Sequence, residues 1–434
     1  MLNQWIGRLD NMIKLLVIAD DITGALDTGV QFSKKGVPTL VATYNQLQRS
    51  LYNSSIEVLV IDVESRHLTS AQAYDTVFSV AKFAADAGVR YFYKKTDSTL
   101  RGNIGAELTA LIDACKTDFL AFVPAFPKNS RTTQGGIQYV DDTPLCETGF
   151  SNDPFEPVSS SSIAEIIAQQ SDIKTLNILT DQYDKADLAD TNKTIYIFDA
   201  QTDSDMEKLG NTLKSAGKLQ FLAGCAGFAE MLPSLIELHT TDVEWLPPKG
   251  NQLIITGSVN QVTINQLQRA KSLGYYVITL DTEQKLDPSF PESFAGKQLI
   301  HEISTVLGTH QRVIIESVNN RAQMEYTEEI AKKKGLQNVD LRQLISDNIG
   351  SLTQHILNTV SVNNLIIFGG DTLYSILQRI DCDGIVPLVE ISPGVVLSKT
   401  VYANNSFSII TKSGGLGDDD VVSVIDSFIL QLQQ

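Results

Sequence analysis

Residues 93–105 concentrate side chains that could bind and orient a charged ligand. They include three cations, one carboxylate and three hydroxyl groups: Lys94, Lys95, Arg101, Asp97, Thr96, Ser98 and Thr99. The stretch follows a strand-like segment at 90–92 and precedes a helix-like run at 106–112. Backbone N–H groups at a helix start, together with the helix dipole, favour a bound anion. The stretch therefore predicts an anion-binding turn, with a capped loop of solvated charges as the plain alternative.

Two further charged groups stand where strands are expected to end. Asp20 and Asp21 follow an apolar run at 14–19, and Arg66 follows another at 57–63. Ligands of open α/β sheets bind outside the carboxyl ends of the strands, and a guanidinium group can grip a carboxylate with two donors. These residues are candidates for the same site. One aspartate could instead cap the next helix, and Arg66 could be a surface arginine.

Glycine-rich turns recur after apolar runs in the second half of the chain. They lie at residues 257–259, 369–372, 392–395 and 411–418. Paired glycines free backbone N–H groups to wrap an anion, and Asp371 and Thr372 could reach a ribose, a phosphate or a hydrated metal. If the sheet is parallel, the four turns lie along one edge. We therefore expect a phosphate site in this half.

Known nucleotide motifs narrow the choice of chemistry. The chain has no Gly-x4-Gly-Lys-Ser/Thr sequence, and no Gly-x-Gly-x-x-Gly follows a first strand. Cations and carboxylates lie in the first half, and phosphate-type turns lie in the second. This division suits phosphoryl transfer between two bound ligands.

Alternating apolar strand runs and amphipathic helices position these residues. The pattern predicts an α/β fold of two domains, each a mainly parallel sheet flanked by helices, and 434 residues exceed one ordinary core. Prolines and a loss of periodicity mark a linker at 245–251, with a hinge at 245–250. We assign substrate binding to residues 1–244 and nucleotide binding to 252–434. We expect residues 1–11 to be an optional lead-in, because Met12 stands just ahead of the first strand.

Composition excludes several classes of partner. The net charge of −17 opposes binding to nucleic acid or an anionic membrane. Four separated cysteines and five unpaired histidines indicate neither a disulfide framework nor a metal site. No apolar run approaches the ~20 residues of a membrane span. We expect a cytoplasmic protein with reduced thiols that binds small molecules.

In order along the chain, these motifs resemble those of the four-carbon acid sugar kinases. The resemblance rests on residues 19–25, 94–103, 124–127, 257–259, 369–372 and 412–417. It implies an N-terminal sugar-acid domain, a C-terminal nucleotide domain, and ATP-dependent phosphorylation of the terminal hydroxyl of a tetronate, with Mg²⁺. A homodimer is a further expectation. The family position near Leu416 is more often aromatic, a small departure.

The resemblance also assigns site residues. The substrate contacts it implies are Asp20, Arg66, Lys95, Thr96, Asp97 and Ser98. The ATP contacts it implies are Ser258, Gly369, Gly370, Asp371, Thr372 and Gly415. Metal ligands stay unassigned. Members act on threonate, erythronate or 3-oxo-tetronate, and residues 152–167 are more like those of threonate-type members. D-threonate is therefore the expected acid, with D-erythronate and 3-oxo-tetronate as alternatives.

A mechanism follows as a hypothesis. Lys95 and Arg66 neutralise the acid's carboxylate, while Thr96 and Ser98 hydrogen-bond its hydroxyls. Asp20 or Asp97 is the catalytic carboxylate that orients the 4-hydroxyl and accepts its proton. Arg131 or Lys412 adds to Mg²⁺ and glycine amides in neutralising the phosphoryl group. The rival classes are a non-catalytic sugar-acid sensor and a dehydrogenase or aldolase, the aldolase using Lys94 or Lys95 as a Schiff base.

Overall fold

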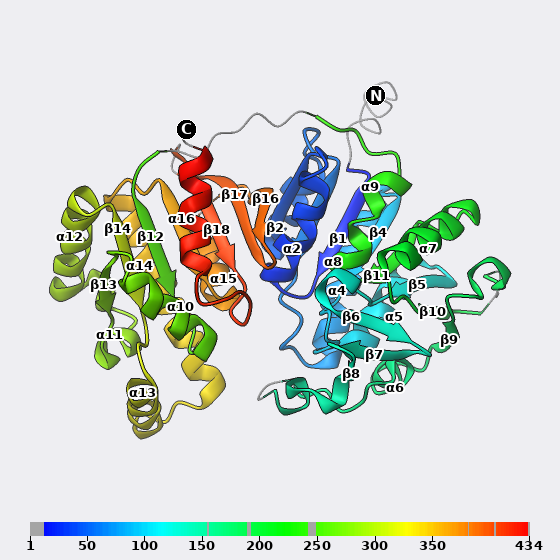
Figure 1. The fold of residues 1–434 in the computed structure, drawn as a ribbon, viewed down its shortest axis with the longest axis horizontal. Coiled ribbons are helices and arrows are strands. Elements are labelled where there is room, and N and C mark those ends of the chain that lie inside the picture. Colours follow the sequence, from blue (N-terminus) through cyan, green and yellow to red (C-terminus); the bar gives the residue numbers. More distant parts are fainter. Residues whose placement is uncertain are drawn as a thin grey trace. The chain divides into compact units, whose positions relative to one another are not determined.

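The computed structural model describes residues 13–153, 156–188, 192–241, 249–380, 382–402 and 405–432 (Figure 1). Two compact units make up the chain, Met1–Asp242 and Val243–Gln434. Most of the expected linker at 245–251 lies outside the described residues, so the linker and its hinge stay predictions. Among the described helices, none is long and apolar enough to cross a membrane.

An eight-stranded sheet forms the centre of the first unit, in the order β2-β3-β1-β4-β11-β5-β10-β9. Its pairings are all parallel. The strands are β1 (Leu15–Ala19), β2 (Thr39–Thr43), β3 (Val58–Asp62), β4 (Tyr91–Lys95), β5 (Phe119–Val123), β9 (Lys174–Ile178), β10 (Thr194–Phe198) and β11 (Phe221–Gly224). Strands β1, β3 and β5 are buried along their whole length. That explains their continuous apolar sequences.

Helices flank this sheet (Figure 1). They are α2 (Ile22–Ser33), α3 (Leu47–Leu51), α4 (Ser70–Ala87), α5 (Ile104–Cys115), α6 (Ile163–Ala168), α7 (Asp203–Ser215), α8 (Ala226–Ala229) and α9 (Leu232–Leu235). Local sequence sets their limits. Helix α4, for example, begins with a capping box between Thr69 and Gln72 and ends at Gly88 in the left-handed conformation.

A small antiparallel sheet accompanies the main one. It consists of β6 (Arg131–Gln134), β7 (Ile137–Val140) and β8 (Thr143–Pro144). Prolines and glycines in residues 124–136 predict a loop, and residues 137–139 and 144–147 predict a hairpin. The loop prediction is wrong for residues 131–134, which form β6. Gly135 and Gly136, both with positive φ, turn the chain so that β6 pairs with β7. Residues 145–147 form a 3₁₀ turn, η4 (Leu145–Glu147).

The register of the first sheet brings the ends of three strands together. Ala19 at the end of β1 pairs with Asp62 of β3 on one side and with Lys95 of β4 on the other. The chain runs from β1 to β2 and β3 on one side, then crosses to β4 on the other. The β1/β4 boundary is thus a topological switch point, where open α/β sheets bind ligands.

The second unit repeats this arrangement in a seven-stranded sheet, in the order β13-β14-β12-β15-β18-β17-β16. Its strands are β12 (Gln252–Thr256), β13 (Tyr276–Thr279), β14 (Arg312–Glu316), β15 (Asn364–Phe368), β16 (Val386–Ser392), β17 (Val395–Tyr402) and β18 (Asn405–Lys412). The first five strands in the order are parallel, and β17 is antiparallel to both neighbours. The α/β class with two mainly parallel sheets is confirmed.

The described helices of the second unit are α10 (Gln261–Lys271), α11 (Thr282–Leu286), α12 (Phe294–Thr309), α13 (Arg321–Lys333), α14 (Asn338–Thr359), α15 (Gly370–Arg379) and α16 (Val421–Leu432). Two of them, α10 and α15, lie next to the candidate site of this unit. Helix α10 follows the turn after β12, and α15 begins directly after β15. Residues 392–395, one of the four glycine-rich turns, join β16 to β17 as a hairpin. This turn still reaches the same edge, because Ser413 N–H donates to Gly394 O at 3.1 Å.

Candidate functional site

Arg66 gathers three carboxylates at the switch point of the first unit. Its Nε and Nη2 atoms each lie 2.7 Å from Asp20 Oδ2. Nη1 lies 2.9 Å from Asp21 Oδ2, and Nη2 lies 3.9 Å from Asp97 Oδ1. The structure therefore brings together residues from the ends of β1, β3 and β4, as the sequence predicted. Arg66 is largely buried and is not a free surface arginine.

Lys95 enters this cluster from the last position of β4. It is almost completely buried, and its Nζ lies 3.8 Å from Asp20 Oδ1. Gly24 makes room for it, because a Cβ atom there would lie 2.6 Å from Lys95 Nζ. Asp21 has two roles: its Oδ1 accepts from Gly24 N–H at 2.8 Å, capping α2, while Oδ2 pairs with Arg66.

Asp97 is held by the loop that contains it. Arg101 Nε lies 2.7 Å from Asp97 Oδ2, and Nη2 donates to Oδ1 at 3.2 Å. Thr99 Oγ1 donates to Oδ2 at 2.5 Å. Leu100 and Gly102, both with positive φ, bend the loop so that these groups converge. Both oxygens of Asp97 are thus engaged by the protein.

Arg101 is a site residue to which the sequence gave no specific role. Besides binding Asp97, its Nη1 lies 3.2 Å from Asp153 Oδ2, and its guanidinium carbon lies 5.4 Å from the centroid of the Phe150 ring. Arg101 therefore ties the loop after β4 to a segment about 50 residues later in the chain. In the sequence, only the spacing of four residues between Asp97 and Arg101 could have indicated that these two side chains pair.

Lys94 does not belong to the site, and its expected place in the cation cluster is wrong. Successive side chains of a strand point to opposite faces, so Lys94 faces α5 while Lys95 faces the carboxylates. Lys94 is fully buried, with Nζ 2.9 Å from Glu107 Oε2 and 2.7 Å from the carbonyl oxygen of Lys95. Burial raises the pKa of Glu107, although Lys94 opposes this. This internal ion pair does not suit a Schiff-base lysine.

Two polar atoms at the site are buried without a hydrogen-bond partner among the described residues: Asp20 Oδ1 and Thr96 Oγ1. Such groups are costly unless something satisfies them. Both belong to residues expected to contact the sugar acid, and a ligand hydroxyl could satisfy either atom. Ser98, the other expected hydroxyl contact, is half-buried, and its carbonyl accepts from Gln138 Nε2 at 3.2 Å.

The neighbouring cations keep both candidate bases ionised. Burial alone would raise the pKa of Asp20, but Arg66 and Lys95 bring it below its ordinary value. Burial likewise opposes ionisation of Asp97, yet Arg101 and Arg66 hold its pKa well below the usual range. Asp20 differs from Asp97 in that one of its oxygens, Oδ1, accepts no hydrogen bond from the described residues.

In the second unit, three turns form what we call the phosphate cradle, residues 257–258, 369–372 and 413–415. Register places them side by side, since Phe368 pairs with Thr256 on one side and Lys412 on the other. Gly257 N–H donates to Thr372 Oγ1 at 3.1 Å. Among the expected ATP contacts, Ser258, Gly369, Gly370, Thr372 and Gly415 all belong to this edge.

Glycines keep the space between the turns of the cradle free of side chains. A Cβ atom at Gly369 would lie 3.8 Å from Ser258 Cβ, and one at Gly414 would lie 3.7 Å from Ser258 Oγ. A Cβ at Gly415 would lie 3.7 Å from Asn260 Nδ2. Side chains at these glycines would fill the space between the turns. The residues present therefore fit a nucleotide phosphate.

Asp371 is positioned by a residue that the sequence did not single out. Its Oδ1 lies 2.8 Å from Nη2 of Arg342 on α14, and Oδ2 contacts Arg342 Nε. Among the described residues, no group of three His, Cys, Asp or Glu side chains could hold a metal ion. Mg²⁺ therefore stays a prediction, and Asp371 is a candidate to approach it through the nucleotide.

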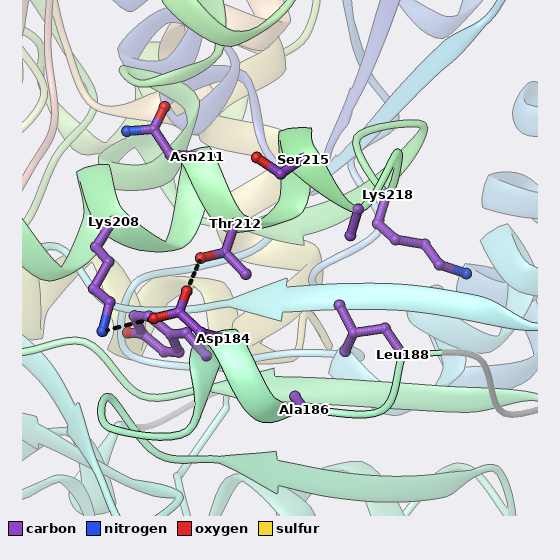
Figure 2. Close-up of a pocket in the computed structure, with 10 residues that line it drawn as sticks. Asp184, Ala186, Leu188, Lys208, Asn211, Thr212, Ser215 and Lys218 are labelled. Carbon is purple, nitrogen blue, oxygen red and sulfur yellow. Dashed lines mark hydrogen bonds and ion pairs between the residues drawn. The ribbon is translucent and has the colours of Figure 1, made fainter.

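Two pockets of the first unit differ in their relation to the site. One of about 270 Å³ is lined by Arg66, Arg101 and residues 156–159. A larger one, of about 680 Å³, lies between α7 and residues 183–188. Figure 2 shows Lys208 and Thr212 of α7 directed at Asp184. Lys208 Nζ lies 3.5 Å from Asp184 Oδ2, and Thr212 Oγ1 donates to Asp184 Oδ1 at 3.2 Å. None of the site residues named above lines the larger pocket.

Comparison with known proteins gives a consistent picture. Residues 15–232 match the family described as a sugar-binding N-terminal domain, and residues 253–422 match a nucleotide-binding C-terminal domain. D-threonate kinase of Salmonella typhimurium is 29% identical over 94% of this chain and 97% of its own length. D-erythronate kinase of Heliobacterium modesticaldum is 28% identical over 96% and 98%. 3-oxo-tetronate kinase of Haemophilus influenzae is 26% identical over 93% and 97%.

Solved structures support the fold. A Salmonella typhimurium protein superposes with a TM-score of 0.78 at 22% identity, covering 98% of this chain and 99% of its own. A Haemophilus influenzae protein gives a TM-score of 0.72 at 23% identity, covering 95% and 100%. The two-unit α/β architecture is shared across these chains.

Proposed function

Because the chain belongs to the four-carbon acid sugar kinase family, we propose that it transfers the γ-phosphoryl group of ATP to the 4-hydroxyl of D-threonate. One observation carries the proposal: a cluster of cations and carboxylates with a free Asp20 oxygen in the first unit accompanies a glycine-lined cradle in the second. The 29% identity to a D-threonate kinase supports the choice of acid. D-erythronate and 3-oxo-tetronate are the alternative substrates.

The ion pairs of Arg66 and Lys95 indicate different roles for these two cations. Arg66 is already engaged by Asp20 and Asp21, so its main role is to hold Asp20 in position. Among the described residues, the one ion pair of Lys95 is a long 3.8 Å contact with Asp20, which leaves its ammonium group available for the carboxylate of the sugar acid. Thr96 donates its hydroxyl to the acid or accepts from it. Ser98 is a further contact.

Asp20 is the proposed catalytic carboxylate. Two donors of Arg66 fix its Oδ2, so that Oδ1 can orient the 4-hydroxyl and accept its proton as the new O–P bond forms. A low pKa suits this role, because the loose transition state of phosphoryl transfer depends mainly on positioning and charge stabilisation. Asp97, with both oxygens engaged, shapes the site and stabilises Arg66.

The cradle would hold ATP through the backbone amides of Gly370 and Gly415 and the hydroxyls of Ser258 and Thr372. The N–H of Gly369 is already donated to Lys412 O at 3.0 Å, so Gly369 would contribute through its lack of a side chain. Bound Mg²⁺ would supply charge neutralisation on the phosphates. Arg131 is turned to its own small sheet: Nη1 donates to Asn129 O at 2.6 Å and lies 4.0 Å from Asp141. We therefore assign it no phosphate contact. A homodimer and a cytoplasmic location remain predictions.

Substrate identity is tested by a coupled assay of ADP release. D-threonate, L-threonate, D-erythronate and 3-oxo-tetronate are supplied separately with saturating Mg·ATP. The proposal expects the highest kcat/KM with D-threonate. Preference for another of these acids would change the proposed substrate but leave the proposed kinase activity intact. ATP binding without turnover on any of the acids would favour a sugar-acid sensor.

A further inference from the structure

Lys412 is the last residue of β18 and lies directly beneath the phosphate cradle. Its side chain is fully buried. Nζ donates to Gly414 O at 2.9 Å and lies 3.5 Å from Thr263 Oγ1 on α10. It also lies 5.1 Å from the centroid of the Phe368 ring, next to Gly369 in the chain. One ammonium group thus contacts segments leading into two turns of the cradle.

This cation has no carboxylate partner among the described residues. On the surrounding elements, Arg269 of α10 pairs with Asp420 at 2.9 Å. Asp371 at the start of α15 pairs with Arg342. Lys399 of β17 is itself a cation, and Asp418 and Asp419 are exposed to solvent. A buried charge without a partner is costly. Burial accordingly lowers the pKa of Lys412 to about 8.

We propose that Lys412 is the buried counter-charge of the cradle and that its positive charge is compensated only when nucleotide phosphates bind. It is a positioning residue, because its contact is with Gly414 O and its charge acts on the ligand through the turn. This inference rests on the proposed function, which supplies the phosphates. It also requires that Lys412 contribute more than packing.

Proton uptake distinguishes an electrostatic role from a purely structural one. Because burial favours the neutral form of Lys412, part of its population is uncharged in the free protein near pH 8. Nearby phosphates would favour the charged form, so ATP binding near this pH should be accompanied by proton uptake. The ATP phosphates are themselves fully ionised there. Calorimetric titration with Mg·ATP in two buffers of different ionisation enthalpy measures the uptake.

Two substitutions separate the charge from its titration. Lys412→Met removes the charge and should weaken ATP binding at least ~10-fold while abolishing the uptake. Lys412→Arg keeps a charge that does not titrate near pH 8, so it should retain much of the affinity but lose the uptake. In the wild type, ATP affinity should fall between pH 8 and pH 10, and in the arginine variant it should not.

Lys285 provides a matched control in the same unit. It is also fully buried, burial lowers its pKa to about 8, and Nζ donates to Ser317 O at 2.7 Å and Thr327 Oγ1 at 3.0 Å. Lys285→Met should destabilise the protein yet preserve ATP-linked proton uptake.

The outcomes separate the inference from the proposed function. Wild-type protein that binds ATP without taking up protons at pH 8 overturns the inference, as does uptake that persists in Lys412→Arg or disappears in Lys285→Met. If Lys412→Met does not fold, the wild-type, Lys412→Arg and Lys285→Met titrations still decide. A folded wild-type protein that binds no ATP would contradict the proposed function itself.

Discussion

Asp20 and Asp97 are equivalent in sequence terms, since each is an aspartate just beyond a strand in a cation-rich setting. Their surroundings separate them. Asp97 has both oxygens engaged by Arg101 and Thr99, whereas Asp20 keeps one buried oxygen free. A carboxylate that must accept a hydrogen bond from substrate needs such an oxygen. The distinction depends on loop geometry, which residue type and spacing do not encode.

Replacement of Asp20 tests this assignment. Asp20→Asn should lower kcat by at least ~10²-fold, the size expected for loss of a general base, with a smaller change in the KM for ATP. Asp97→Asn should act mainly on the KM for the acid, because it loosens Arg101. Steady-state kinetics with saturating ATP measure both effects.

Asp21→Asn is the matched control, because Asp21 also binds Arg66 but caps α2 instead of facing substrate. Its kcat should remain within ~10-fold of the wild type. A kcat loss in Asp97→Asn as large as expected for Asp20→Asn, with Asp20→Asn near wild type, would transfer the catalytic role to Asp97.

Arg101 is the other residue whose role emerges only from the structure. Arg101→Met would remove the link between Asp97 and the segment around Asp153, so the KM for the acid should rise ~10-fold or more while kcat falls less. Asp153→Asn breaks only the distal contact and should produce a smaller rise. Unchanged KM in Arg101→Met would show that this link does not support acid binding.

At the scale of elements, buried strands were the most predictable feature. Continuous apolar runs identified β1 and β3, and the apolar runs before two of the glycine-rich turns identified β12 and β15. The exact end of β4 was harder to predict, because Lys94 and Lys95 are polar residues inside a strand. Once β4 extends to Lys95, alternation places the two lysines on opposite faces. Strand β6 was missed because its sequence, RTTQ, has no apolar pattern.

Helix α13 was likewise hard to predict, because its sequence has little apolar pattern. Only Thr327 and Ala331 are buried among its described side chains, so little apolar periodicity indicated a helix. The pairing of Arg342 with Asp371, 29 residues apart, is a tertiary contact with no local signal. Residue types therefore predicted many of the residues at the strand ends that form the candidate sites. The partners of their side chains could be known only from the folded structure.

The start of α2 gives a prediction at this scale. Gly24→Ala would place a methyl group 2.6 Å from both Lys95 Nζ and Asp21 Oδ1, so it should displace the lysine. We expect a rise of at least ~10-fold in the KM for the acid with the KM for ATP unchanged, because the effect is confined to the first unit. Kinetics at varied acid and varied ATP separate the two.

Gly308→Ala is the control for adding a methyl group to a helix. A Cβ at Gly308, within α12, would meet no atom within 4 Å, so alanine should stabilise the protein slightly and leave both KM values unchanged. An equally small effect of Gly24→Ala would show that Lys95 need not occupy its observed position.

For the whole molecule, each of the two units has its candidate site at a switch point of a mainly parallel sheet. The first unit concentrates ionised carboxylates and cations there, and the second uses backbone amides and small residues. This difference fits a sugar acid in one unit and a phosphate chain in the other. The negative overall charge makes these local cations more important for anion binding.

Two of the buried carboxylates, Asp20 and Asp97, also predict how stability depends on pH. The pKa values of Asp20 and Asp97 are lowered in the folded state, so their contribution is present above their unfolded pKa of about 4. It should be lost as the pH falls below that value, because the unfolded chain then binds more protons. Urea unfolding followed by circular dichroism between pH 3 and pH 7 should show this loss.

Asp97→Asn should flatten the acid limb of that profile, since one of the lowered groups no longer titrates. An unchanged slope below pH 4 would mean that Asp97 is not held ionised in the folded protein.

The central claim is that this chain phosphorylates the terminal hydroxyl of a four-carbon sugar acid. Incubation of the purified chain with Mg·ATP and D-threonate, followed by ³¹P and ¹³C NMR, tests it most directly. We predict one new phosphomonoester whose phosphorus couples to C4, formed in equal amount with ADP. Phosphate attached elsewhere, or ADP release without any phosphorylated acid from the four substrates, would contradict the account.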